Sequence, residues 1–115
     1  MLKKANRIKQ KKDFDKIFRE GKKINTDFLF IKVVDNHSGK SRFGFVISKK
    51  ISKKSTVRNK IKRILGEIIQ KRIPEIKKGI DIVTIVKKDF SKMPLLDIDN
   101  LVYLVLKKNS LLEKK

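Results

Sequence analysis

Basic residues between positions 49 and 63 form the part of the chain whose types and spacing could do chemistry. Arg58, Asn59, Lys62 and Arg63 fall within six residues, and four lysines precede them at positions 49, 50, 53 and 54. An arginine guanidinium offers a planar fork of donors that matches phosphate geometry, whereas a lysine ammonium is a compact point charge. This pattern predicts a surface that holds nucleic-acid phosphates, with an ordinary solvated helix face as the alternative.

The same region contains no grouping typical of catalysis by a protein. It has no pair of carboxylates, no histidine cluster and no nucleophile beside a base, and we expect the single histidine, His37, to be solvated in a polar turn. The chain has no cysteine, which excludes a disulfide framework, a redox centre and zinc bound by cysteine. We therefore expect binding and positioning, with a nuclease that has its own catalytic groups as a third hypothesis.

A helix over residues 56–72 must position these basic side chains. Ser55 or Thr56 is the expected N-cap, and Pro74 stands just beyond the expected end. The apolar stripe that should pack on a sheet consists of Val57, Ile61, Ile64, Leu65 and Ile68. The basic side chains lie on the opposite arc, and the helical angle places Gly66 midway along that arc.

Charge narrows the class of partner. The 115 residues include 32 Lys and Arg against 12 Asp and Glu, a net charge of +20, and residues 1–63 carry +16 of it. Nucleic acid matches such a field best, while compositional bias toward lysine is the alternative. The length predicts one RNA-binding domain, 1–115, with a basic arm over 1–12. No apolar run approaches the ~20 residues of a membrane span, and we expect a cytoplasmic protein with neither membrane nor small-molecule partner.

The remaining pattern predicts a two-layer α+β sandwich. The other expected elements are a helix over 14–20, strands over 28–35, 42–48 and 80–86, and a last helix to about Leu112. Asp13 should cap the first helix and Gly21 should end it at the C′ position, while Asp97 or Asp99 should start the last helix. We expect the first two strands to pair as a hairpin and the apolar third to lie centrally. A further strand around 22–26 is left open.

Aromatic residues offer a second kind of contact. Phe14, Ile17 and Phe18 share one face of the first helix. Such a stripe is usually core, although aromatic rings also stack on single-stranded bases. Phe28 and Phe30 alternate onto one strand face, and the sequence leaves open whether that face meets the core or a cleft.

Two segments carry a family resemblance. FGFVISKK at 43–50, followed by VRNKIKRI at 57–64, resembles the signature of the bacterial ribonuclease P protein subunit. The resemblance extends over nearly the whole chain, from Asn6-Arg7-Ile8 to the ending at 107–111. It implies the order α-β-β-β-α-β-α with a left-handed crossover through the signature helix, a topology shared with a ribosomal protein domain. This order supports the further strand at 22–26.

The resemblance also implies a function. Members of the family bind ribonuclease P RNA, whose Mg²⁺-dependent active site removes the 5′ leader of precursor tRNA. The protein is then a non-catalytic subunit of an endoribonuclease and holds no cofactor of its own. Carried over by position, the residues that bind the catalytic RNA are Arg58, Asn59, Lys62, Arg63, Lys53 and Lys54. Those that line the leader cleft are Phe14, Phe18, Lys49, Lys50 and Arg7.

Two departures from the family pattern affect the basic helix face. Lys60 replaces a common arginine, which exchanges a forked donor for a point donor. Gly66 stands where the family often has another arginine, so one expected cation is missing. The alternative function is a generic ribosomal or nucleoid-type protein that coats nucleic acid by charge alone.

Overall fold

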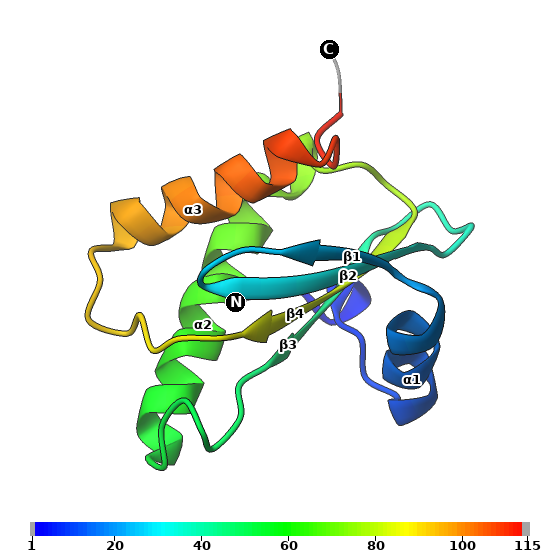
Figure 1. Ribbon diagram of the computed structural model, residues 1–115. Coiled ribbons are helices and arrows are strands. Elements are labelled where there is room, and N and C mark those ends of the chain that lie inside the picture. Colours follow the sequence, from blue (N-terminus) through cyan, green and yellow to red (C-terminus); the bar gives the residue numbers. More distant parts are fainter. Residues whose placement is uncertain (1, 114–115) are drawn as a thin grey trace.

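The computed structural model describes residues 2–113, and positions 1, 114 and 115 of the expected domain lie outside the described residues. A four-stranded sheet and three α-helices make up the fold (Figure 1). The elements, in chain order, are the 3₁₀ helix η1 (Lys4–Asn6), α1 (Lys11–Glu20), β1 (Lys22–Asn25), β2 (Leu29–Asp35), β3 (Arg42–Val46), α2 (Ser55–Arg72), the 3₁₀ helix η2 (Ile73–Glu75), β4 (Ile80–Val86) and α3 (Leu95–Lys108).

The strand order of the sheet is β1-β2-β4-β3. β4 pairs antiparallel with β2 and parallel with β3, so the expected hairpin between β2 and β3 is wrong. The expected central place of β4 is confirmed, and it explains the error. Six of its seven residues are buried, and a strand that is apolar on both faces gains most from a central position between two others. The further strand that was left open is β1, which pairs with β2 at the edge.

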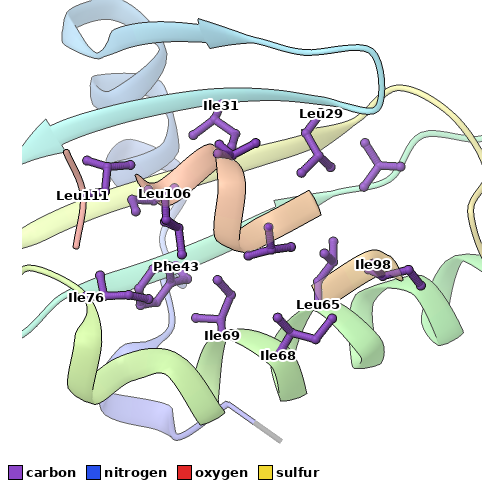
Figure 2. Packing of buried hydrophobic residues seen from close by; sticks show 14 of the residues in the cluster. Leu29, Ile31, Phe43, Leu65, Ile68, Ile69, Ile76, Ile98, Leu106 and Leu111 are labelled. Atoms are coloured by element: carbon purple, nitrogen blue, oxygen red, sulfur yellow. The ribbon is translucent and has the colours of Figure 1, made fainter. Parts of the chain in front are cut away.

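The main core lies between one face of the sheet and the helices α2 and α3 (Figure 2). Ile61 and Leu65 of α2 and Ile98 of α3 are at most 1% exposed, and they belong to the same core cluster as the strand residues Leu29 and Ile31. The expected apolar stripe of α2 is confirmed at Ile61, Leu65 and Ile68, with Val57 and Ile64 half-buried beside them. Burying such side chains stabilises the fold by about 1.5–3 kcal/mol each.

Helix α1 covers part of the opposite face of the sheet (Figure 1). Ile17 is 1% exposed and packs with Ile8 and with Val83 of β4, which is fully buried. The ring of Phe14 lies over Gly44 of β3, where an added Cβ would stand 2.6 Å from Phe14 Cε1. A glycine is therefore needed at position 44 for a close approach between helix and strand. The α+β fold class is confirmed. The sheet with α2 and α3 forms the two expected layers, and α1 adds a partial third layer on the other face, because β4 is apolar on both faces.

Several element boundaries differ from expectation. α1 begins at Lys11 with Gln10 at the N-cap, and Asp13 instead stands in the first turn. α3 begins two residues earlier than its earliest expected start, after Pro94, and ends at Lys108. Gly21 does end α1, but its φ of −70° is not left-handed. A side chain there would collide with the carbonyl of Ile17, so close approach explains this glycine.

The expected basic arm is folded onto the domain in residues 2–8, which we call the N-terminal strap. The Ile8 amide donates to the Phe43 carbonyl at 3.0 Å, and the Asn6 side chain donates to the Ser41 carbonyl at 2.8 Å. Leu2 is buried against α2 beside Gly66. The sequence did not predict this arrangement, because a segment so rich in lysine shows little apolar periodicity.

An ion-pair network joins the end of α2 to α3. Arg72 donates from Nε and Nη2 to the two carboxylate oxygens of Asp99 at 2.8 and 3.0 Å. The guanidinium also contacts Glu75 at 3.1 Å, and its Cζ lies 4.7 Å from the centre of the Tyr103 ring. The hydrogen bonds from Arg72 lower the pKa of Asp99 below its ordinary value. A guanidinium and a carboxylate joined by two parallel hydrogen bonds fix the relative orientation of the two helices and also stabilise the fold.

We predict that Asp99→Asn lowers the free energy of unfolding at pH 7 by about 1–2 kcal/mol, because one charge-assisted pair is lost. A carboxylate with a lowered folded-state pKa stabilises the fold above its unfolded pKa of about 3.9, and this contribution is lost as the pH falls through the folded-state pKa. Urea unfolding of both proteins from pH 7 to pH 2.5 should show the difference closing below about pH 4. A difference that stays constant over this range would contradict the assignment.

We predict that Gly44→Ala destabilises the protein by about 1–3 kcal/mol, because the added methyl group displaces the Phe14 ring. In a Phe14→Ala background the same change should cost little or stabilise, since alanine suits a strand better than glycine does. Urea unfolding of the four proteins of this cycle measures the coupling. An equal cost in both backgrounds would show that Phe14 is not the group in the way.

Candidate nucleic-acid interface

A groove of about 480 Å³ opens between the N-terminal strap, strand β3 and helix α2. We call it the α2 groove. Its lining comprises Leu2, Arg7, Ile8, Phe14, Phe43, Gly44, Phe45, Asn59, Lys62, Arg63 and Gly66. The structure thus brings together residues that the sequence placed on two separate RNA surfaces. Lys62 and Arg63 come from the basic helix motif, whereas Arg7 and Phe14 were assigned to the leader cleft.

The α2 wall of the groove is polar and accessible. Asn59, Lys62 and Arg63 are all exposed, and each lies within four residues of the next along the helix, on the side away from the core. Arg58 differs, because it does not line the groove. Its Nη1 donates to the Ser52 carbonyl at 2.9 Å and the side chain is half-buried. Arg58 therefore ties the preceding loop to the helix.

That loop carries the four lysines that precede α2. Lys49, Lys50, Lys53 and Lys54 are exposed, and Lys54 is the N-cap residue without a side-chain cap. The expected serine or threonine cap is therefore wrong, because α2 begins at Ser55. Backbone amides without a cap at the start of a helix favour the binding of anions, and the four lysines add positive charge at this end of α2.

Gly66 is not an open gap in the basic face. It is buried, and the point where its Cβ would stand is 3.8 Å from the Leu2 side chain. Gly66 lines the α2 groove beside Lys62 and Arg63, as its predicted place on the basic arc implies, and it is buried because the N-terminal strap crosses the helix there.

The aromatic residues of α1 border a half-buried apolar surface. Ile17 is the buried member of the stripe, while Phe14 and Phe18 are half-buried and pack beside Val46 and Ile85. The interpretation as core holds in full for Ile17 and in part for Phe14 and Phe18, which pack against the same cluster. Phe14 also lines the α2 groove, whereas Phe18, Lys49 and Lys50 do not.

Phe28 and Phe30 do not share an environment. Phe28 packs against the main core, with its ring centre 6.4 Å from that of Phe90. Phe30 alternates with the buried Leu29 and Ile31 and so points to the α1 face of the sheet. The expectation that both lie on one face is wrong, because Phe28 precedes β2.

Sequence reasoning missed Gly44 and the ion pair beneath α1. Arg42 holds Asp81 through Nη2–Oδ2 and Nε–Oδ1 contacts of 2.6 and 3.0 Å, and Asp81 is 4% exposed. The hydrogen bonds to Asp81 raise the pKa of Arg42, and its guanidinium stabilises the fold by pairing with this buried carboxylate. The available signal was an aspartate at the second position of an otherwise apolar strand, since a buried charge needs a partner.

Residues 2–113 contain no group of three His, Cys, Asp or Glu side chains placed to hold a metal ion. Within the same range, no helix is both long and apolar enough to cross a membrane. His37 is exposed, as expected, with a left-handed φ of 55° in the turn after β2.

The chain is similar in sequence to known proteins. The family model described as Ribonuclease P matches residues 2–109. The chain is 41% identical over 86 residues to the ribonuclease P protein component of Synechocystis, covering 74% of this chain and 69% of the relative. It is 29% identical to that of Alkaliphilus oremlandii over 111 residues, 96% of each chain.

Solved structures of similar proteins share the fold. The Staphylococcus aureus RNase P protein superposes with a TM-score of 0.85 at 30% identity, covering 96% of this chain and all of that one. The RNase P protein from Thermotoga maritima gives a TM-score of 0.78 at 32% identity, covering 88% of this chain and 96% of that one. The chain belongs to the ribonuclease P protein family.

Proposed function

We propose that this ribonuclease P subunit binds ribonuclease P RNA through α2 and its preceding loop, and binds the 5′ leader of precursor tRNA through the aromatic surface beside α1. The observation that carries the proposal is the α2 groove, where Lys62, Arg63, Arg7 and Phe14 meet. One concave surface there combines cations for phosphates with a ring for a base.

The assignment of α2 to the RNA subunit rests on charge and access. Asn59, Lys62 and Arg63 are exposed, and Lys53 and Lys54 stand exposed at the start of the same helix. The four ion pairs among residues 2–113 involve only Arg42 and Arg72 as cations, so these side chains have no carboxylate partner there. Arg58 has a supporting role in this proposal, because it positions the loop through Ser52.

The assignment of the leader to the α1 side rests on the two half-buried rings. Phe14 and Phe18 present flat apolar surface beside Val46 and Ile85, and such rings accept unpaired bases whatever their identity. Arg7 lines the adjoining α2 groove, and Lys49 and Lys50 are exposed residues in the loop that follows β3. In this proposal these three cations neutralise phosphates of the leader.

In this proposal the protein subunit positions the substrate and supplies positive charge. The RNA subunit carries out the Mg²⁺-dependent hydrolysis. The enzyme acts in the cytoplasm. Because the subunit holds the leader and the ribonuclease P RNA together, the substrate meets the RNA in a fixed orientation and not by random encounter. The alternative is a generic nucleic-acid coat, which would need the net charge but not the groove or the accessible rings.

The proposal predicts that the protein raises multiple-turnover cleavage of precursor tRNA by its matching ribonuclease P RNA at physiological Mg²⁺. Reactions with RNA alone, protein alone and both together measure this directly. We expect product with its mature 5′ end at a rate that rises on adding protein, and none from protein alone. No gain over RNA alone would support the generic coat, and cleavage by protein alone would support a protein nuclease.

We predict that Phe14→Leu with Phe18→Leu weakens binding of precursor tRNA by the assembled enzyme by up to a few kcal/mol, because stacking surface is lost. Leucine keeps an apolar face of similar size, which limits any folding loss. Mature tRNA lacks the leader and should bind nearly as before, and assembly with the RNA subunit should persist.

The measurement is the ratio of precursor to mature tRNA affinity, beside a thermal melt of the free protein. Leu95→Ala with Leu96→Ala is the matched control, since both are exposed apolar residues on α3 away from the groove. An unchanged ratio together with a lowered melting temperature would show that the two rings serve only as core.

A further inference from the structure

A second concavity, of about 440 Å³, adjoins the α2 groove, and Arg7 lines both. We call it the strap pocket. It is formed by the N-terminal strap, the first turn of α1 and the start of β3, and its lining comprises Lys4, Ala5, Arg7, Lys9, Gln10, Lys12, Asp13 and Arg42. Five of these eight residues are cations, and neither the basic helix motif nor the aromatic surface includes Lys4, Lys9 or Lys12.

The carboxylates near the strap pocket are already engaged. Asp81 forms two contacts with the guanidinium of Arg42, and Asp13 forms a third at 3.4 Å. Lys4, Lys9 and Lys12 are exposed, and the ion pairs among residues 2–113 do not include them. The pocket therefore keeps a positive charge that the fold itself does not neutralise.

The backbone that carries these lysines is held in place. The Ile8 amide donates to Phe43, the Asn6 side chain donates to Ser41, and Arg7 Nε donates to the Leu2 carbonyl at 2.7 Å. Lysines on a fixed backbone give up less freedom on binding than lysines on a free tail. This distinguishes the strap pocket from a solvated basic arm.

The start of α1 adds an unfavourable feature that an anion would relieve. Lys11 and Lys12 occupy the first turn, where the helix dipole is positive, and Gln10 makes no side-chain cap. Asp13 stands in the same turn, but its carboxylate contacts Arg42 at 3.4 Å. Cations at this end cost a few tenths of a kcal/mol each, whereas a phosphate would be stabilised. Together with the concave shape, this arrangement favours a phosphate-bearing ligand.

We propose that the strap pocket binds backbone phosphates of RNA through Lys4, Lys9 and Lys12, as a contact separate from both the α2 motif and the aromatic surface. The inference rests on the proposed function, since it takes the ligand to be ribonuclease P RNA or precursor tRNA. Arg7 is shared by the two concavities, so one RNA strand can pass from the α2 groove into the strap pocket.

The test compares the triple variant Lys4→Gln, Lys9→Gln, Lys12→Gln with a control of equal charge, Lys78→Gln, Lys107→Gln, Lys108→Gln. The control lysines are exposed and lie outside both concavities. Affinity is measured from 0.1 to 1 M salt in two arms, for ribonuclease P RNA with free protein and for precursor tRNA with the assembled enzyme. Thermal melts confirm that every variant folds.

We expect the strap variant to flatten the log–log salt slope by about 2 in one arm, because each phosphate contact contributes about 0.7–0.9. Across this tenfold range of salt, a slope change of 2 means that the affinity lost by the strap variant, relative to the unchanged protein, is about 100-fold greater at 0.1 M than at 1 M salt. The arm that changes identifies which RNA supplies the phosphates. Equal flattening in the strap and control variants, or none in either arm, would overturn the inference.

Arg63→Ala separates this inference from the proposed function. If Arg63→Ala flattens the slope for ribonuclease P RNA while the strap variant matches its control, the strap pocket is excluded and the role of α2 stands. If the strap variant flattens the slope while Arg63→Ala does not, the pocket is supported and the assignment of α2 fails.

Discussion

Burial of β4 on both faces is the constraint on which the rest of the structure depends. Ile82 packs into the core beneath α2 and α3, and Val83 packs beneath Ile17 of α1. A strand that is buried on both faces is most stable between two other strands. β2 and β3 therefore flank β4, and β3 is an edge strand of the sheet. The edge of β3 is then partly closed by the N-terminal strap through Ile8, which removes an open pairing surface.

The same constraint explains what could be predicted from sequence. The 56–72 and 80–86 segments were predicted within one residue because their apolar patterns are long and regular. The pairing of β3 was predicted wrongly, since a short turn at 36–41 favours a hairpin locally and only the sheet as a whole favours insertion of β4. Tertiary burial here overrides the local signal.

The candidate site shows a similar division. Lys62 and Arg63 could be assigned from charge and helical angle, because both effects act along one helix. Their meeting with Arg7 and Phe14 depends on the strap crossing α2 at Gly66, a contact between residues far apart in sequence. The helical angle alone places Gly66 on the basic face but does not show that another segment crosses the helix at that position.

Charge distribution links stability to function in this fold. Arg42 and Arg72 take up four carboxylates between them, and each of these four ion pairs joins separate elements of the structure. The remaining surplus of positive charge repels itself and opposes the compact state. A polyanion bound along the α2 groove offsets that repulsion, and any ligand that binds only the folded chain stabilises it by mass action. In the proposed complex with RNA, Lys54 at the uncapped start of α2 would be favourable although it is costly in the isolated protein.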